Sequence, residues 1–489
     1  MTSPKLIALW ITRRVGWKTV SGLLCVAVMT VFVVDNTQTV HQKIQRSAFF
    51  EAYMRLLAQQ SSPKGCRANH SFREADMLLQ LYNNISLGRV KRISIPELYH
   101  LGDAQNYTQF LNTLISKRKR GPLLQGYLNN TGGSTWDRFY KSISQYHLYH
   151  PYENNVINDL LKDVSTRPIV SSAFKGGGSQ FKMLLTFDNG ARGLFKPMRY
   201  PRGVDTFLNY FYFDDFERHT AEIAGYHLDK VLGFHRAPPT VGRVVNMTLD
   251  VLMHGTSEVK NKTYVSPDGN LCVHNHCRLH CDHICGSPEL LEGSVSVFLP
   301  NETLSPRSLN TRHPYSPIWR RTIKAEWESD PTYCERRLKN NKNNTEYTSG
   351  RLLLDIIDMA ILDFFTGNMD RHFYERFTEF GADTFLIHYD NGKGFGRAKD
   401  DCMTCLAPVQ QCCMIRLSTL AKLVKLYQGP DSLGQVLRDS MTSDPLSPIL
   451  LDHHLDALDR RVGIVLKTIH RCIKGKTSWS SVVIDDGYM

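Results

Sequence analysis

Three acidic side chains and one lysine along this chain have the residue types and flanking sequences of a phosphoryl-transfer site. Lys196 lies near the end of the apolar stretch GLFKPM, and Asp390 follows FLIHY, a run that predicts a buried strand, and precedes Asn-Gly. Asp370 stands in GNMDRH, just after a predicted helix. Phosphoryl transfer needs a cation on the phosphates, carboxylates for a divalent metal ion and an acidic residue that orients the attacking hydroxyl. We therefore expect Lys196 to hold phosphates, Asp390 to reach the metal ion and Asp370 to accept the proton of the nucleophile.

The third acidic residue comes from a predicted helix over 213–233, which offers two glutamates as partners for an inward-pointing lysine. At helical spacing Glu217 shares a stripe with apolar residues, whereas Glu222 lies on a polar face with an ordinary i,i+4 partner, Arg218. A buried lysine needs an anionic partner. We expect Glu217 to point inward and Glu222 to stay on the polar face. The apolar stripe beside Glu217 consists of Ala221, Ala224, Leu228 and Val231.

The elements that must position these residues follow a kinase-like order. KGGGSQFKMLLTF, DNG and ARGLFKPM predict a glycine-rich loop, a strand, a tight turn and a second strand, because Asn and Gly adopt positive φ easily. Residues 176–178, all glycine, would let backbone N–H groups approach phosphate, although a flexible turn explains them equally well. Asp214 or Asp215 can cap the start of the following helix, and Gly233 can end it.

A larger part of the chain opens with RLLLDIIDMAILDFF at 351–365, a nearly all-round apolar helix that must be buried. A small lobe with strands would thus precede a larger helical lobe. The 489 residues, 42% hydrophobic and 22% charged, exclude wholesale disorder and are enough for several domains or one bilobal domain. The net charge of +12 favours anionic partners, although a basic surface that only keeps the protein soluble explains it as well.

The N-terminus predicts a membrane-anchored lumenal protein. Residues 19–34, TVSGLLCVAVMTVFVV, form the longest apolar run, and the basic residues before it should stay in the cytoplasm. This run is short for a full span and long for a signal-peptide core. Because no small-residue cleavage site follows directly, a type II signal anchor is favoured over a cleaved peptide. Residues 1–18 would then be a cytoplasmic tail and 35–66 a stem.

Sequons and cysteines indicate an oxidising, glycosylating compartment. Eight N-x-S/T sequons and eleven of the 12 cysteines follow the apolar run. The segment 272–285, CVHNHCRLHCDHIC, makes zinc an alternative, but it lacks the two close cysteine pairs separated by a longer loop that are usual in zinc sites. Nested disulfides are therefore favoured there. The candidate glycosylated residues are Asn69, Asn84, Asn106, Asn129, Asn246, Asn261, Asn301 and Asn343.

Several motifs together resemble the secretory-pathway kinases of "family with sequence similarity 20", which include the Golgi casein kinase and the glycosaminoglycan xylosylkinase. The motifs are GLFKPM, YFDDFERHTAEIAGYHLD, AEWESDPTYC, DFFTGNMDRH, IHYDNGKGFG, QQCC and HLDALDRR. The resemblance spans about 165–475 and implies an α+β, disulfide-stabilised, atypical bilobal protein-kinase-like fold. We expect a kinase domain over 161–480, with an N-lobe over about 161–300 and a C-lobe over about 301–480, after a family-variable helical region at 67–160.

The resemblance also implies a set of site residues. Lys196 would hold the phosphates of ATP, and Glu217 and Asp390 would bind a divalent cation, Mn²⁺ by preference and Mg²⁺ as the alternative. Asp370 would be the catalytic base, and Glu217 stands where a pseudokinase of the family has Gln, which favours an active enzyme. Further nucleotide contacts would come from Gln180, Lys182, Ser296, Val297, Phe298, Leu299 and Glu375. The implied disulfides are Cys272–Cys285, Cys277–Cys281, Cys334–Cys412 and Cys413–Cys472.

Three departures from the family pattern leave every catalytic group in place. Phe373 stands where relatives have a second His after DRH, which would alter hydrogen bonding near Asp370. Cys402 and Cys405 lie in a loop where relatives usually lack cysteines, and they can pair with each other. Cys66 would then be a free thiol or a link to another chain.

Three functions remain open from the sequence. A Golgi kinase that phosphorylates Ser in Ser-x-Glu motifs of secreted acidic proteins is favoured, because YFDDFERH and GNMDRH resemble that branch. A xylosylkinase acting on the proteoglycan linker is the alternative, since FKPMRYPR and the retained anchor resemble that branch. A pseudokinase activator is disfavoured by Glu217, Asp370 and Asp390. We expect a Golgi-lumen protein, or one released by cleavage, that pairs with itself or a related pseudokinase and binds no nucleic acid.

Overall fold

The computed structural model describes the second part of the chain, from Gly121 to Asp485. The residues left out within this range are 129–131, 179, 208–209, 276–281, 341–344, 349, 429 and 477–478. Within the described ranges no helix is both long enough and apolar enough to cross a bilayer. The predicted tail, anchor and stem lie outside them. So do Cys66, Cys277 and Cys281, and the sequon residues Asn69, Asn84, Asn106, Asn129 and Asn343.

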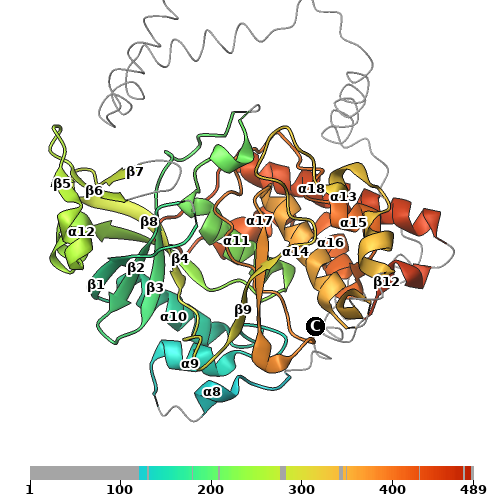
Figure 1. Cartoon of the computed structure of the whole chain (residues 1–489), viewed down its shortest axis with the longest axis horizontal. Helices are drawn as coiled ribbons and strands as arrows, with labels where there is room; N and C mark the ends of the chain where they lie inside the picture. The colour runs from blue at the N-terminus through green and yellow to red at the C-terminus, as the bar shows by residue number, and fades with distance from the viewer. Residues whose placement is uncertain are drawn as a thin grey trace, which may run out of the picture. The chain divides into compact units, whose positions relative to one another are not determined.

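A five-stranded antiparallel sheet, in the order β1-β2-β3-β8-β4, forms the first lobe (Figure 1). Side chains of β2 alternate between buried and half-buried, as expected of a strand with one covered face. Its buried residues Met183, Leu185 and Phe187 share a core with Trp136 of α9 and Leu160 of α10. The bounds are α9 Thr135–Ser142, α10 Asn154–Thr166, β1 Ile169–Phe174, β2 Met183–Phe187, β3 Arg192–Pro197, β4 Thr240–Asn246 and β8 Leu290–Val297.

The turn between β2 and β3 is the one that the sequence predicts. Gly190 closes it in the left-handed region at φ 77°, and its N–H donates to the Phe187 carbonyl at 2.9 Å. Strand β1 has no counterpart among the predicted strands, because the residues IVSSAF do not alternate strictly between apolar and polar. The three glycines 176–178 therefore connect β1 to β2, with Gly177 at φ 88° and Gly178 at φ 75°.

Helix α11 spans His219–Leu232 and begins six residues later than predicted. Neither Asp214 nor Asp215 caps it, since the residue before its first turn is Arg218, in an extended conformation. Asp215 is buried, and its carboxylate accepts hydrogen bonds from Tyr200 (2.7 Å) and Arg218 (3.0 Å), which keep the preceding chain out of the helix. The predicted end is confirmed, because Gly233 takes the left-handed C-cap position at φ 84°.

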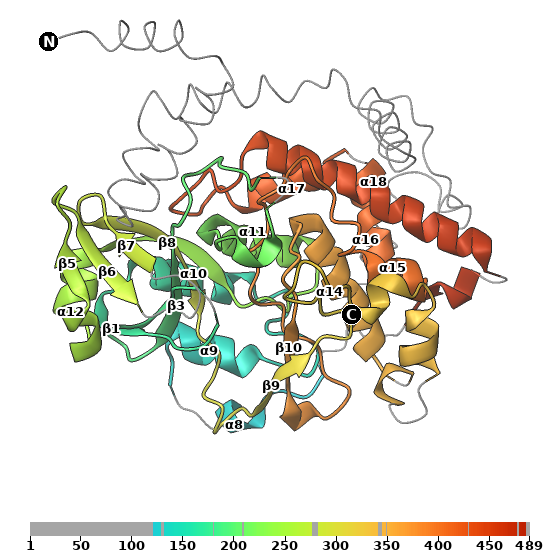
Figure 2. The ribbon, with the colours of Figure 1, turned by 45° about the horizontal axis from the view of Figure 1, so that its top comes forward.

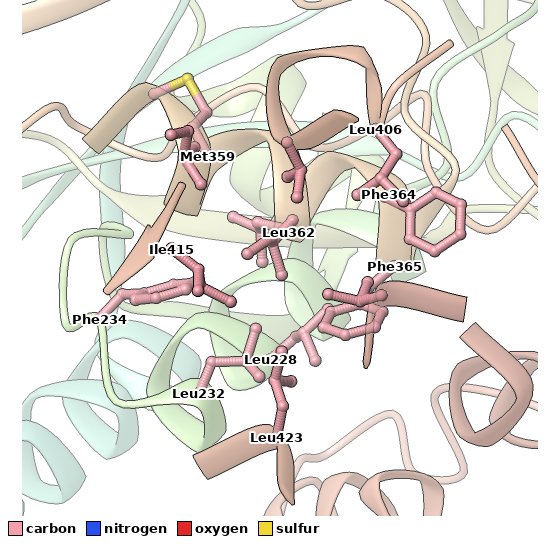
Figure 3. Packing of buried hydrophobic residues seen from close by; sticks show 14 of the residues in the cluster. Leu228, Leu232, Phe234, Met359, Leu362, Phe364, Phe365, Leu406, Ile415 and Leu423 are labelled. Atoms are coloured by element: carbon pink, nitrogen blue, oxygen red, sulfur yellow. The ribbon is translucent and has the colours of Figure 1, made fainter. Parts of the chain in front are cut away.

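The second lobe is built around α14, Leu352–Thr366, and every residue of this helix is buried. This confirms the predicted all-round buried helix with a shift of one residue. Figure 3 shows Leu228 of α11 and Leu362 and Phe365 of α14 converging in one apolar cluster, which joins the two helices. The helix therefore gives the residues that follow it a rigid base.

Buried charges also fix α14, although the sequence pattern presents this helix as apolar. Asp355 contacts Arg236 at 3.1 Å, Arg351 at 2.8 Å and Arg416 at 2.7 Å, and all four side chains are buried. Burial alone would raise the pKa of Asp355, but the three guanidinium groups hold it well below its usual value. Asp358 contacts Arg236 and Arg416 as well. Buried carboxylates of this kind persist only when fully paired.

Three further helices share the hydrophobic core of α14. Figure 2 shows α18 running as one long helix beside α17 and α16. Their bounds are α16 Leu417–Gln428, α17 Leu433–Ser440 and α18 Asp452–Gly475. The small-lobe and large-lobe order of an α+β, kinase-like fold is thereby confirmed.

Four disulfides are present in the described residues. Three of them are pairs that the resemblance implies: Cys272–Cys285, Cys334–Cys412 and Cys413–Cys472. The fourth, Cys402–Cys405, joins the two cysteines that depart from the family pattern. The bond at Cys272 agrees with the preference for disulfides over zinc in that segment.

The remaining elements are short, and the segment Tyr264–Asn270 forms a unit distinct from the described parts of 84–263 and 271–489. Within that segment the Gly269 N–H closes a turn on the Ser266 carbonyl at 2.9 Å. The other bounds are α8 Gln125–Leu128, η1 Tyr212–Asp214, η2 Met247–Met253, α12 Ser257–Asn261, β5 Thr263–Val265, β6 Leu271–Asn275, β7 Asp282–Cys285, β9 Arg307–Arg312, α13 Glu326–Ser329, η3 Cys334–Lys339, η4 Thr345–Tyr347, β10 Phe373–Phe377, η5 Thr378–Phe380, α15 Ala407–Cys412, β11 Ile415–Arg416, η6 Trp479–Ser481 and β12 Val483–Ile484.

Candidate active site

Lys196 is buried and stands at the centre of a cluster of three carboxylates. It lies on β3 opposite Ser294 of β8, and only 7% of it is exposed. Its Nζ lies 2.9 Å from Glu217 Oε2, 2.5 Å from Glu222 Oε1 and 2.7 Å from Asp390 Oδ1. Three carboxylates around one ammonium leave an excess of negative charge, which suits a divalent cation.

The cluster shifts the protonation equilibria of its members in opposite directions. Burial alone would lower the pKa of Lys196, but the nearby carboxylates raise it well above its usual value, so the ammonium stays charged. Lys196 in turn holds the pKa of Asp390 below its usual range. Burial raises the pKa of Glu217 despite the attraction of Lys196. Glu217 is therefore the easier of these two carboxylates to protonate.

Glu222 is a member of this cluster, and the prediction that it lies on a polar outer face is wrong. It is 5% exposed. Its expected partner Arg218 pairs with Asp215 at 3.0 Å instead. Because α11 begins at 219, Glu222 lies in its first turn and Glu217 lies before the helix. The helical spacing counted from residue 213 therefore does not describe where these two side chains point. Asp229, two turns further along α11, is also buried.

Backbone groups of the loop after Asp390 hold Glu222 in place. Its carboxylate accepts hydrogen bonds from the N–H groups of Asn391 (3.2 Å) and Gly392 (2.9 Å). The close approach of this loop to α11 depends on Gly225, where a Cβ atom would lie 2.7 Å from the Cβ of Asn391. A glycine one turn after an acidic residue in a helix was the sequence signal for a closely packed neighbour.

The loop that carries Asp390 is fixed on its other side by Lys393, which the sequence analysis passed over. The Lys393 ammonium is buried and donates to the backbone carbonyls of Tyr212 (3.2 Å), Phe213 (3.0 Å) and Asp215. These carbonyls belong to the segment that leads to Glu217. The segments that carry Glu217 and Asp390 are thereby joined through one lysine. A lysine between two glycines, as in Gly-Lys-Gly, gave the only sequence hint.

Asp370 lies in the neighbouring loop after α14, and two further residues tie it to the cluster. Asn368 Oδ1 accepts from the Asp370 N–H at 3.0 Å, and Asn368 Nδ2 donates to the Asp390 carbonyl at 3.3 Å. Arg371 donates to both carboxylate oxygens of Asp363 at 2.9 and 2.8 Å and to Asn391 Oδ1 at 3.1 Å. Bidentate pairing of this kind is geometrically specific. No local sequence pattern marked the roles of Asn368, Asp363 and Arg371.

Aromatic side chains flank Asp370. His372 Nε2 lies 2.9 Å from Asp370 Oδ1, and His372 Nδ1 lies 3.0 Å from the Ser316 hydroxyl. The exposed ring of Trp319 lies 4.5 Å from the His372 ring. Phe373, the departure from the family pattern, begins β10 and contacts Trp319 at 6.2 Å between ring centroids. It therefore adds to the aromatic wall and, unlike a His, cannot donate a hydrogen bond to Asp370.

Gln180 and Lys182 lie at the glycine-rich side of the site. Gln180 Nε2 donates to the Asp215 carbonyl at 3.4 Å, while its buried Oε1 has no hydrogen-bond partner in the described residues. The Lys182 ammonium lies 2.7 Å from the place of a Cβ on Gly178. The charge of Lys182 also lowers the pKa of Asp390, which places it near the carboxylate cluster.

The remaining predicted nucleotide contacts lie further along the sheet. Ser296 and Val297 end β8, and the Ser296 hydroxyl accepts from Thr240 at 2.8 Å. Phe298 uses both backbone groups inside the protein, since its N–H donates to the Arg192 carbonyl and its carbonyl accepts from Tyr140. Leu299 follows, half-buried.

Glu375 lies on β10, apart from the carboxylate cluster. Its Oε2 is 3.4 Å from Arg307 Nε, and burial raises the pKa of Glu375 even though Arg307 opposes the shift.

A cavity of about 310 Å³ adjoins the loop of Asp370. Its lining includes Asn368 and Arg371 of that loop and three further basic residues, Arg320, Arg321 and Lys324. The acidic residues Asp363 and Glu328 also line it, so cations outnumber carboxylates. A basic cavity beside an acidic, metal-type cluster can receive a negatively charged acceptor.

Comparison with known proteins identifies the family. A family model described as "Golgi casein kinase, C-terminal, Fam20" matches residues 134–481. The chain belongs to the Fam20 family. A solved structure of the Golgi casein kinase with Mn/ADP bound resembles this chain with a TM-score of 0.73 and 38% identity, over 80% of this chain and 92% of that one. This confirms the resemblance seen in the motifs.

Among Fam20 relatives, an extracellular serine/threonine protein of Drosophila melanogaster is 44% identical over 71% of this chain and 65% of that protein. The extracellular serine/threonine protein kinase FAM20C of Homo sapiens is 42% identical over 72% of this chain and 60% of that protein. The glycosaminoglycan xylosylkinase of Homo sapiens is 35% identical over 73% of this chain and 85% of that protein. The match thus spans less than two thirds of the first two relatives.

The donor set of this Fam20 chain fits a hard divalent cation. Oxygen atoms of Glu217, Glu222 and Asp390 all lie within 4.8 Å of one another. Carboxylate oxygens are the ligands that Mn²⁺ and Mg²⁺ prefer. All three carboxylates contact Lys196, but Glu217 and Asp390 suit the metal best, because only Glu222 also accepts hydrogen bonds from two backbone N–H groups.

Proposed function

We propose that this chain is an ATP-dependent kinase of the secretory pathway that transfers the γ-phosphate to Ser in Ser-x-Glu motifs of secreted proteins. The observation that carries the proposal is the placement of Lys196 among Glu217, Glu222 and Asp390, next to the loop of Asp370. A phosphate cradle, a metal site and a base are the parts that phosphoryl transfer requires.

Each residue has a distinct role in this proposal. Lys196, held charged by its carboxylate neighbours, binds the phosphates of ATP. Glu217 and Asp390 hold Mn²⁺, which when bound neutralises charge on the phosphates. Asp370 accepts the proton of the acceptor hydroxyl, and Asn368 keeps it beside the phosphate site. Gln180, Lys182, Glu375 and the segment 296–299 would complete the nucleotide site.

The basic wall of the neighbouring cavity favours an acidic peptide as acceptor. Arg320 and Lys324 are exposed, and neither forms an ion pair with any described residue. Unpaired cations beside the catalytic loop attract a carboxylate near the acceptor Ser. A neutral sugar acceptor would gain nothing from them. This observation supports the choice of the Ser-x-Glu kinase over the xylosylkinase in our proposal.

The proposed setting is the Golgi lumen, with the chain anchored through 19–34 or released by cleavage. Among the described sequon residues, Asn261 and Asn301 are exposed, as glycosylation requires. Asn246 is half-buried, and its Oδ1 accepts from the N–H groups of Thr248 and Leu249. Asn261 and Asn301 are therefore the better glycan candidates. Pairing with a second copy or a related pseudokinase is part of the same proposal.

The test offers the purified full chain labelled ATP and Mn²⁺ with three acceptors: a Ser-x-Glu peptide, the same peptide with Gln for Glu, and a galactosyl-xylose glycoside. We expect label on the first peptide, much less on the second and none on the glycoside. Asp390→Ala should abolish it, whereas Asp400→Ala, a half-exposed control, should not. Label on the glycoside alone would establish the xylosylkinase, and label on none would contradict catalysis by the chain alone.

A further inference from the structure

A second cluster of metal-ligating side chains lies outside the kinase site. Asp205 Oδ1 lies 3.4 Å from His454 Nε2 and 3.6 Å from His453 Nε2, and the ligand atoms of all three residues fall within 4.8 Å of one another. The loop before α11 provides Asp205, and the first turn of α18 provides both histidines. None of these residues belongs to the carboxylate cluster around Lys196.

The distances within this cluster are those of ligands around a shared ion. A tetrahedral ion with bonds of about 2.0–2.2 Å separates its ligand atoms by about 3.3–3.5 Å, whereas a direct N–H···O hydrogen bond would bring them to about 2.9 Å. Asp205 Oδ1 is buried, and its nearest donors, on His453 and His454, lie beyond the usual N–H···O hydrogen-bond distance from it. A buried carboxylate oxygen of this kind needs a cation or a donor.

We propose that Asp205, His453 and His454 form a second metal site, which binds Zn²⁺. Two imidazole nitrogens and one carboxylate oxygen suit zinc, whereas the all-oxygen cluster of Glu217 and Asp390 suits Mn²⁺ or Mg²⁺. Three protein ligands leave a fourth position for water, and the partial exposure of Asp205 (35%) and His453 (39%) gives solvent access to it. The proposal does not depend on kinase activity.

Contacts on both sides already hold the ligands in place. Arg202 Nη1 donates to the Pro448 carbonyl at 2.6 Å, and a Cβ on Gly203 would lie 2.9 Å from Leu451, so this loop is seated against the start of α18. A site arranged before the metal arrives loses less entropy on binding.

One contact competes with the metal. The Leu451 N–H points at His454 Nδ1 at 3.3 Å, a long hydrogen bond that puts the proton of a neutral His454 on Nε2. Zn²⁺ on Nε2 would shift this proton to Nδ1 and break the contact. Binding should therefore release the Leu451 amide, which gives the site a signature that can be read without measuring activity.

A metal ion at this site would join two segments next to the loop that begins at Asp390. Thr206, directly after Asp205, donates its N–H to the Gly396 carbonyl at 2.6 Å, and its hydroxyl donates to Asp215 at 2.6 Å. The ring of His454 packs on Phe395 at 6.3 Å between centroids. A bound ion would thus fix the loop of Asp205 on α18 and stabilise the end of the segment that begins at Asp390.

The experiment uses the full chain, purified without a histidine tag and stripped of metal. Calorimetric titration with Zn²⁺, and visible absorption after loading with Co²⁺ as a tetrahedral probe, report binding at the site. We expect one Zn²⁺ bound through this cluster, a higher melting temperature with Zn²⁺, and affinity at least about tenfold lower in Asp205→Asn and in His453→Gln. His254→Gln, at an exposed histidine elsewhere, is the matched control and should bind as the parent does.

The variant Asp390→Asn distinguishes binding at this site from binding at the all-oxygen cluster. It should lose affinity for Mn²⁺ and keep the Co²⁺ absorption spectrum. Melting temperatures of the metal-free variants show whether each is folded, and Asp205→Asn preserves size where His453→Gln does not. The proposal is overturned if the parent binds no Zn²⁺ at micromolar concentration. It is equally overturned if folded Asp205→Asn and His453→Gln bind as the parent does, or if Asp390→Asn removes the Co²⁺ spectrum.

Discussion

Asn368 joins the two acidic loops of the site: its amide group donates to the Asp390 carbonyl at 3.3 Å, and its carbonyl oxygen accepts from the Asp370 N–H at 3.0 Å. The proposed base and the proposed metal ligand are therefore held in register by one side chain. Neither residue can shift along its loop without breaking this bridge. The fold therefore sets the separation between Asp370 and Asp390 before substrates bind.

Replacement of the proposed base should affect chemistry and leave nucleotide binding intact. We expect Asp370→Asn to lower kcat by about 10²–10⁴-fold, the range for general-base catalysis, with little change in the KM for ATP. The amide keeps the size of the carboxylate but cannot take the proton. Steady-state kinetics on the Ser-x-Glu peptide measure this, with Asp159→Asn on an exposed helix face as control. A variant that kept at least half of the parental kcat would remove Asp370 from the mechanism.

The two glutamates of the cluster should fail in different ways. Glu217→Gln should raise the Mn²⁺ concentration needed for half-maximal activity and leave stability nearly unchanged. Glu222→Gln should lower the free energy of unfolding by about 1–3 kcal/mol, because it weakens a buried contact with Lys196 and hydrogen bonds to the Asp390 loop. Urea unfolding and Mn²⁺ titration of both variants distinguish the roles. Equal effects of the two substitutions on Mn²⁺ would show that Glu222 is also a metal ligand.

Gly225→Ala should oppose the ordinary trend of helix propensity. Alanine is favoured over glycine in a helix by about 1 kcal/mol, but here its Cβ would lie 2.7 Å from Asn391 Cβ and push the Asp390 loop away. We expect lower stability together with weaker Mn²⁺ binding. Gly463→Ala in α18 is the matched control, since its Cβ would meet only Tyr427 at 3.4 Å and should stabilise the protein. A stabilised, fully active Gly225→Ala would contradict the proposed close approach.

Two buried histidines make the fold sensitive to acid. Burial lowers the pKa of His227 and of His313 to about 3, from an ordinary value near 6.5. Below about pH 6.5 these histidines bind protons in the unfolded chain but stay neutral in the folded chain. Their contribution to the free energy of unfolding is therefore full above that pH and decreases as the pH falls toward 3. Each histidine contributes at most about 1.4 kcal/mol per pH unit. Urea unfolding at pH 7 and pH 5 measures this effect. His313→Gln should reduce the difference in the free energy of unfolding between the two pH values. An unchanged difference would show that His313 does not contribute.

Residues with distinctive neighbours in the sequence could be placed before the structure. Lys196, Glu217, Asp370 and Asp390 sit in motifs whose chemistry is readable, and three of them meet in one cluster. The buried helix at 351–365 follows from its composition alone. These predictions needed only local residue types and periodicity.

What the sequence could not give depends on long-range contacts. Glu222 was misplaced because the carboxylate of Asp215 accepts from Tyr200 and Thr206, in an earlier segment, and does not cap the helix. Lys393 acts through three carbonyls far away in the chain, so no local pattern marks it. β1 lacks alternation and is defined by pairing with β2.

The exposure of the carboxylate cluster is one-sided. Lys196 and Glu222 are closed off, with side-chain exposures of 9% and 5%, whereas the side chain of Asp390 is 56% exposed. The solvent-exposed side of the cluster is therefore the side on which Asp390 lies. Under the proposed function, metal and nucleotide would both reach the cluster on the side of Asp390, whose loop Lys393 helps to hold in place.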